Sequence, residues 1–168
     1  FMESDLTSFE KKALEKGYRE IAGVDEAGRG PLAGPVVSAA VVLPPLFPVS
    51  GITDSKRLTP KKREELYEKI YDNAVSIGIG IVDSVEIDRI NILKASLLSM
   101  SISVSNLHPQ PDCLLIDGIF QIPSDKPQET IAKGDALSIS IAAASIVAKV
   151  TRDKLMVRYH EDYPQFGF

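Results

Sequence analysis

The chain has 168 residues and a formal net charge of −4, with 44% hydrophobic and 25% charged residues. These values predict one soluble globular domain spanning 1–168, with a core large enough to need no disulfide. The negative charge disfavours a protein that coats nucleic acid by bulk electrostatics, although it permits a nuclease whose acids hold metal ions. The sequence has one cysteine and no apolar run of membrane-spanning length, so we expect a cytoplasmic monomer without a membrane partner.

Helices and strands alternate through the first half of the chain. An amphipathic pattern predicts a helix over 8–16, and apolar runs predict strands at 21–24 and 35–43. The pair Thr59–Pro60 supplies a capping hydroxyl followed by a proline at the first helical position, so a helix should begin there. Alternating residues then predict a strand over 75–82.

The second half continues the same alternation. Asp83 starts a capping-box pattern, which predicts a helix running to about residue 107 with a break near Asn91. A short buried strand at 113–116 leads into Asp117, and a long helix should cover 136–160. Interleaved strands and helices predict the α/β class in one domain.

The segment 23–35, GVDEAGRGPLAGP, places two acids directly before a glycine-rich turn. A dinucleotide fingerprint would need its third glycine one position before Gly34, and a P-loop would need lysine and a hydroxyl residue where Arg29 and Gly30 stand. Glycine-rich backbone can nevertheless approach a ligand with its N–H groups exposed, and Arg29 adds a charged fork. The alternative is a plain turn between two strands.

Acidic residues stand at the ends of several predicted elements. Asp25 and Glu26 would point to opposite faces of a continuous strand, so both can serve one site only if the strand ends there; otherwise they form a polar strand end. Asp117 closes a buried strand, although Asp117 and Gly118 together would also suit a hairpin turn. Asp135 precedes the long helix, where it would make a good N-cap.

Together these acids indicate a metal site on one side of a sheet. Clustered carboxylates stay ionised only beside a compensating cation, and hard oxygen ligands favour Mg²⁺ or Mn²⁺. Such ions can clamp the attacking water and the leaving oxygen of a phosphodiester. Phosphates could contact the loop 54–56 and the helical stripe of Ser145, Lys149 and Arg152, although both also suit ordinary solvated surface.

The segment 23–35 resembles the signature of bacterial type 2 ribonuclease H (ribonuclease HII). The type 3 enzymes carry a different pattern around the glycine turn. The resemblance covers nearly the whole chain and implies a ribonuclease H-like fold, a mixed central sheet flanked by helices. Its further motifs occur in family order: 54–56 (DSK), 115–118 (LIDG), 133–135 (KGD), 143–153 (AASIVAKVTRD) and 163–168 (YPQFGF).

The resemblance implies an endonuclease that needs Mg²⁺ or Mn²⁺. Its substrates would be the RNA strand of RNA–DNA hybrids and duplex DNA with embedded ribonucleotides, cut 5′ of the ribonucleotide to leave 3′-hydroxyl and 5′-phosphate ends. The catalytic metal ligands would be Asp25, Glu26, Asp117 and Asp135. The turn Gly28-Arg29-Gly30 would meet the 2′-hydroxyl, the group that distinguishes RNA from DNA, and the adjacent phosphate. The remaining substrate-binding positions would be Ser55, Lys56, Asn91, Ser145 and Lys149.

In the family, a histidine-lysine-glycine-tyrosine segment follows the motif at 163–168. Its tyrosine stacks on the sugar beside the ribonucleotide junction. Because this sequence stops at Phe168, we expect a truncated family member with weakened junction recognition and reduced or lost activity. Tyr163 matches a different family position and does not replace that tyrosine.

Two other functions remain open from the residues alone. One is another metal nuclease or a transposase on the same fold, and the other is an α/β module that binds nucleotide or nucleic acid without cutting it. The turn at 28–30 argues against a DNA-only nuclease, which has no 2′-hydroxyl to recognise. The clustered acids argue against a binding module, because without metal they would weaken phosphate binding.

Overall fold

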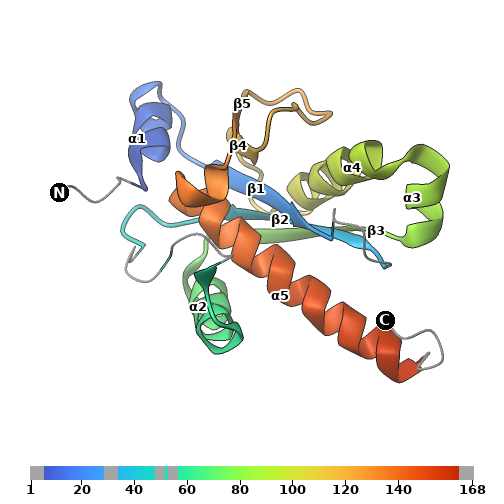
Figure 1. Ribbon diagram of the computed structural model, residues 1–168. Helices are drawn as coiled ribbons and strands as arrows, with labels where there is room; N and C mark the ends of the chain where they lie inside the picture. Colours follow the sequence, from blue (N-terminus) through green and yellow to red (C-terminus); the bar gives the residue numbers. More distant parts are fainter. Residues whose placement is uncertain (1–5, 29–33, 48–51, 53–56, 163–168) are drawn as a thin grey trace.

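A computed structural model describes residues 6–28, 34–47, 52 and 57–162. The described residues form a five-stranded sheet with the strand order β3-β2-β1-β4-β5 (Figure 1). The pairs β1/β2 and β2/β3 are antiparallel, whereas β1/β4 and β4/β5 are parallel. This mixed sheet confirms the predicted α/β class. The strands are β1 (Ile21–Ala27), β2 (Val36–Val42), β3 (Ser76–Val82), β4 (Cys113–Asp117) and β5 (Gln128–Ile131).

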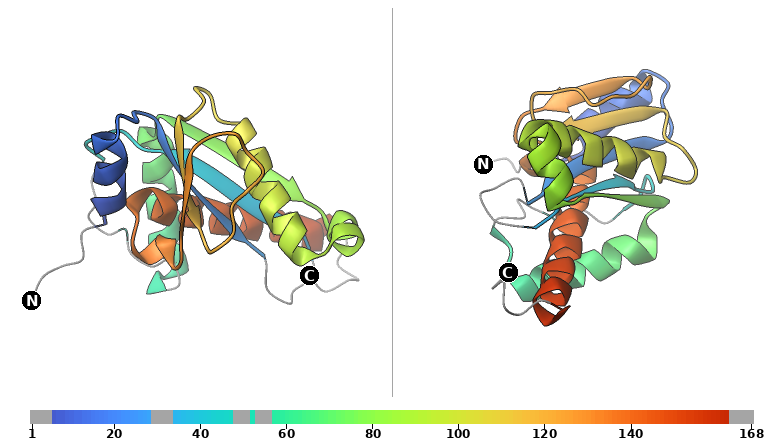
Figure 2. Two further views of the ribbon diagram at one scale, coloured as in Figure 1. Left: turned by 90° about the horizontal axis from the view of Figure 1, so that it is seen from above. Right: turned by 90° about the vertical axis from the view of Figure 1, so that its right-hand side faces the viewer.

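Helices cover both faces of the sheet (Figures 1 and 2). On β2, Ala39 and Val41 pack with the core residues of α2 and α5, whereas Ala40 and Val42 pack with those of α4. Alternate side chains of one strand thus enter two cores, as strand geometry requires. The helices are α1 (Ser8–Glu15), α2 (Pro60–Asn73), α3 (Ser84–Ile90), α4 (Ile92–Ser105) and α5 (Ile139–Asp162).

Side-chain caps set the predicted helix starts. Thr59 Oγ1 accepts a hydrogen bond of 3.1 Å from a backbone N–H in the first turn of α2. Asp83 Oδ1 accepts one of 2.9 Å from the N–H of Glu86 at the start of α3. Asn91 separates α3 from α4 with a φ of 79°, and its side chain caps α4. The break near Asn91 is therefore confirmed.

Glycines in the strands let the two long helices pack close to the sheet. A Cβ added to Gly23 of β1 would lie 2.1 Å from the Ser140 carbonyl carbon of α5. A Cβ added to Gly80 of β3 would lie 2.0 Å from the Ser99 carbonyl oxygen of α4. Because backbone atoms occupy these positions, each helix axis would have to move if the glycine carried a side chain.

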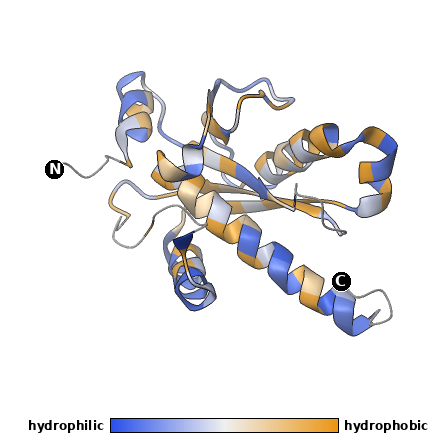
Figure 3. Cartoon of the chain, in the orientation of Figure 1, coloured by the Kyte–Doolittle hydropathy of each residue, from blue (hydrophilic) through white to orange (hydrophobic). Residues whose placement is uncertain are grey.

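The hydrophobic pattern of α5 changes along its length (Figure 3). Residues 139–148 are all buried, but beyond them only Val150 and Arg152 are buried among the described positions of α5. The N-terminal part of α5 therefore belongs to the core of the sheet. No helix in the described part of the chain has the length and apolarity that crossing a membrane requires.

Two local predictions were wrong. The strand β5 was missed in the loop after Asp117, and because β5 runs parallel to β4, a hairpin turn at Asp117–Gly118 is excluded. The long helix begins at Ile139 rather than near residue 136, and Asp135 lies instead in a short 3₁₀ helix, Gly134–Ala136. The capping role considered for Asp135 belongs to Ser138, whose hydroxyl accepts a hydrogen bond from the N–H of Ile141.

Candidate metal and nucleic-acid site

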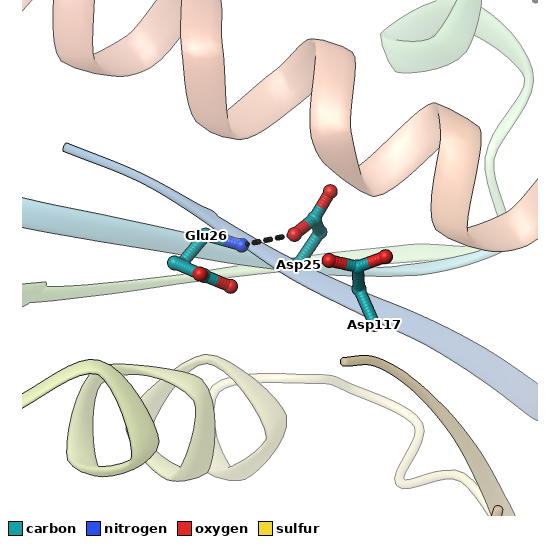
Figure 4. A group of neighbouring side chains, drawn as sticks. All are labelled: Asp25, Glu26 and Asp117. Atoms are coloured by element: carbon teal, nitrogen blue, oxygen red, sulfur yellow. Dashed lines mark hydrogen bonds between the residues drawn. The ribbon is translucent and has the colours of Figure 1, made fainter. Parts of the chain in front are cut away.

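Three carboxylates meet where β1 and β4 end (Figure 4). One oxygen each from Asp25, Glu26 and Asp117 lies within 4.8 Å of the other two. Asp25 is buried, and the other two acids are half-buried. Because β1 and β4 are parallel neighbours, their carboxyl ends reach the same edge of the sheet, which is where open α/β sheets bind ligands. We call these three residues the acidic group.

The strand β1 does not end at Asp25, contrary to the condition set from the sequence. It continues through Ala27, with Asp25 opposite Ala39 and Glu26 opposite Ser38. Asp25 therefore points to the α5 face and Glu26 to the α4 face. Their oxygens still come close because the Asp25 side chain bends towards the backbone of the next residue. There, Asp25 Oδ1 accepts a 2.7 Å hydrogen bond from the N–H of Glu26 (Figure 4).

Asp117 lies on the same face of the sheet as Asp25. Its strand neighbour Leu115 packs with Ile141 of α5, and side chains two apart share a face. Its Oδ1 is buried and has no hydrogen-bond partner among the described residues. Buried polar atoms are nearly always satisfied by a donor, water or ion, so this oxygen is available to a cation.

The acidic group is electrostatically unfavourable by itself. Burial raises the pKa of Asp25 well above its ordinary range, and the carboxylates of Asp117 and Glu26 raise it further. The hydrogen bond from the Glu26 N–H opposes these effects, whereas Asp135 adds to them. Asp135 therefore lies near enough to act on Asp25, although it is outside the acidic group.

These features fit a divalent metal ion. All the candidate ligand atoms are hard carboxylate oxygens, and one of them, Asp117 Oδ1, is buried without a hydrogen-bond donor among the described residues. The mutual repulsion of these carboxylates needs a compensating positive charge. The donor set lacks the nitrogen and sulfur ligands that favour zinc. Mg²⁺ and Mn²⁺ are the ions that this chemistry favours.

The predicted substrate-binding residues are spread over several elements. Gly28 directly follows β1, and its φ of 92° is a left-handed conformation that favours glycine. Asn91 is exposed between α3 and α4, and Ser145 is buried on α5. Lys149 lies one turn beyond Ser145 and forms a 3.0 Å ion pair with Asp153. The predicted residues Arg29, Gly30, Ser55 and Lys56 lie outside the described residues.

Sequence reasoning missed the environment of Arg152. A solvated helix face was one interpretation of its position, but Arg152 is only 5% exposed. Its Nε donates a 2.9 Å hydrogen bond to the carbonyl oxygen of Pro35. The spacing along α5 placed Arg152 on the correct face, but no local pattern indicated that a loop distant in sequence covers that face.

Comparisons with known proteins agree with this geometry. The family model for ribonuclease HII matches residues 22–168. Ribonuclease HII of a Geobacter species is 56% identical over 164 residues, which cover 98% of this chain and 71% of that protein. Ribonuclease HII of Enterococcus faecalis is 55% identical over 164 residues, which cover 98% of this chain and 64% of that protein. The crystal structure of ribonuclease H2 from Pyrococcus horikoshii matches with a TM-score of 0.74 and 30% identity, covering 89% of this chain and 79% of that one. The chain therefore belongs to the ribonuclease HII family and is a ribonuclease H, as its ordered motifs predict.

Proposed function

We propose that the protein hydrolyses the RNA strand of RNA–DNA hybrids and cuts duplex DNA on the 5′ side of an embedded ribonucleotide. The products would carry 3′-hydroxyl and 5′-phosphate ends. The observation that carries this proposal is the acidic group at the end of β1, with the glycine turn starting two residues after Glu26. In a member of the ribonuclease HII family, these carboxylates thus stand close in sequence to Gly28, the first residue of the turn that we expect to contact the ribose.

The acidic group and Asp135 would hold two divalent ions, Mg²⁺ or Mn²⁺. Bound there, the ions would supply Lewis-acid activation of a water and charge stabilisation at the leaving 3′-oxygen. The carboxylates fix the position of this positive charge, and the burial of Asp25 limits competing solvent. No side chain needs to act as the nucleophile.

The other residues would position the substrate. The backbone N–H groups of the turn Gly28-Arg29-Gly30 would contact the 2′-hydroxyl and the adjacent phosphate, so that a ribonucleotide is held in register with the acidic group. The phosphate backbones would be contacted by Ser55, Lys56, Asn91, Ser145 and Lys149.

Cleavage of matched duplexes tests the proposal. Four end-labelled duplexes of one sequence are compared: an RNA–DNA hybrid, DNA with one ribonucleotide, all-DNA and all-RNA. We expect the first two to be cut with Mg²⁺ or Mn²⁺, none to be cut with a chelator, and the all-DNA duplex to stay intact. Extension by a DNA polymerase would verify the 3′-hydroxyl end.

A pair of matched variants distinguishes loss of the metal site from loss of folding. Asp117→Asn should abolish cleavage while the chain stays folded, whereas Asp125→Asn, an exposed aspartate in the β4–β5 connection, should cleave normally. Cleavage of the all-DNA duplex would favour the DNA nuclease or transposase alternative. Metal-independent binding without cleavage of any duplex would favour a binding module, and near-normal cleavage by Asp117→Asn would refute the site.

A further inference from the structure

Arg152 is a buried cation in a part of α5 that is otherwise largely accessible. Among the described residues of α5 after Val150 it is the only buried one. Burying a guanidinium carries a desolvation cost, so the contacts that hold it there must offset that cost. Its Nε–H group donates to the Pro35 carbonyl oxygen, which is buried together with it.

The Arg152 side chain also fills the space beside two glycines. A Cβ added to Gly28 would lie 2.1 Å from Arg152 Nε and 2.7 Å from its Cδ. A Cβ added to Gly34 would lie 3.5 Å from Arg152 Nη2 and 2.6 Å from Met156 Sδ. Both glycines have positive φ, 92° and 108°, a backbone conformation that favours glycine.

Arg152 thus contacts both flanks of residues 29–33. Gly28 precedes that segment, and Gly34 and Pro35 follow it. On the N-terminal side, Gly28 follows Glu26 by two residues, so a contact that holds Gly28 also sets its place relative to the acidic group. Arg152 lies two residues beyond Val150, the last residue of α5 in the core cluster that this helix shares with β2.

We propose that Arg152 is a positioning residue for ribonucleotide recognition: its buried side chain ties Gly28 and Pro35 to α5 and so fixes the place of Gly28 relative to the acidic group. This inference rests on the proposed function, because it assigns Arg152 to the recognition of the same substrate. The proposed role of Arg152 is exerted through Gly28 and not through a contact with the metal ions or the scissile phosphate. Losing it should therefore weaken recognition of ribose more than binding of metal or of DNA.

The test compares Arg152→Met and Arg152→Lys with the wild-type chain. Methionine keeps part of the stem but removes the Nε–H donor, whereas lysine keeps the charge without a donor at the Nε position. We expect kcat/KM for duplex DNA with one ribonucleotide to fall about 10- to 100-fold in Arg152→Met and less in Arg152→Lys. Arg158→Gln, an exposed arginine on the same helix, is the matched control and should behave like wild type.

Two further measurements separate positioning from a general loss of folding. Affinity for the all-DNA duplex and the Mn²⁺ concentration that half-saturates the site should stay within about twofold of wild type, since neither needs the glycine turn. Met156→Ala, which removes a side chain beside Gly34 and leaves Arg152 in place, should show a smaller loss in the same direction.

Three outcomes would overturn the inference. One is a folded Arg152→Met chain with unchanged kcat/KM, and another is a loss that affects all-DNA binding equally. The third is a loss that merely follows the unfolded fraction measured by thermal denaturation. If the wild-type chain itself cuts no ribonucleotide-containing duplex, the proposed function fails first and this inference with it.

Discussion

At the scale of a single residue, Asp25 lowers the stability of the metal-free chain in a way that fits a role in metal binding. Asp25 is 5% exposed and its carboxylate lies among other carboxylates, and both conditions disfavour its charged form. A protein selected only for stability would place a neutral side chain here. The same charge is what a divalent ion needs as a ligand, so the cost in stability fits a binding role.

Replacing Asp25 with asparagine should strongly reduce cleavage and stabilise the metal-free chain. Asparagine keeps an oxygen that can accept the hydrogen bond from the Glu26 N–H, but it removes the buried charge. We expect cleavage to fall by on the order of 100-fold or more. In a chelator at neutral pH, the melting temperature should rise by about 2–4 °C for each kcal/mol of repulsion relieved.

The pH dependence of this stabilisation follows from the raised pKa of Asp25. A raised folded-state pKa favours folding below the ordinary pKa of an aspartate, and this contribution is lost as the pH rises through the raised value. The wild-type chain and Asp25→Asn should therefore melt alike at acidic pH and diverge towards neutral pH. Equal melting temperatures across the whole range would show that the buried carboxylate causes no strain.

At the scale of elements, α1 holds the start of α5 in place. Glu10 Oε2 accepts hydrogen bonds from the Ser138 hydroxyl at 2.6 Å and from the Ser140 N–H at 3.0 Å. A carboxylate from one helix thus satisfies donors at the N-terminus of another, where the helix dipole also favours negative charge. Because α5 carries Ser145, Lys149 and Arg152, this contact supports the elements around the site.

Glu10→Ala should lower the free energy of unfolding by about 1–2 kcal/mol, the usual cost of losing an N-terminal cap. Glu10→Gln should lose less, because its amide oxygen can still accept one of the two hydrogen bonds. Urea denaturation measures the difference. Glu15→Ala, an exposed glutamate at the other end of α1, serves as the control and should stay within about 0.5 kcal/mol of wild type. A loss as large in Glu15→Ala would mean that removal of a glutamate from α1, rather than loss of the cap, explains the effect.

At the scale of the whole molecule, elements with local signals could be predicted from the sequence and those formed by distant contacts could not. Thr59, Asp83 and Asn91 mark helix boundaries through bonds to residues within four positions, and the structure confirms all three. The strand β5 (QETI) has no apolar run, and it forms because β4 offers a parallel edge. The sequence pattern of residues 128–131 alone therefore does not predict its pairing with β4.

The features of the candidate site also separate into those with a local sequence signal and those that depend on distant contacts. The order of motifs identified the family and predicted the acids of the site, because both depend on residue types at fixed places. Asp25 and Glu26 point to opposite faces of the sheet. Their oxygens come close because the Asp25 carboxylate bends towards the N–H of Glu26. The burial of Arg152 depends on a loop more than 100 residues away, since Arg152 and Pro35 are separated by 117 positions. Such packing follows from the assembled fold and not from helical spacing.

The last prediction concerns the response of the whole chain to metal. An ion that binds only the folded state stabilises it by about 2.7 kcal/mol at one hundred times its dissociation constant. Saturating Mn²⁺ should therefore raise the melting temperature by about 5–10 °C, reversibly on chelation, with no substrate present. Asp117→Asn should lose most of this shift because it removes the negative charge of this carboxylate and replaces one of its two oxygens with an amide NH₂, whereas Asp125→Asn should keep it. A shift of equal size in both variants would place the bound metal elsewhere, and no shift in the wild-type chain would contradict metal binding by the acidic group in the absence of substrate.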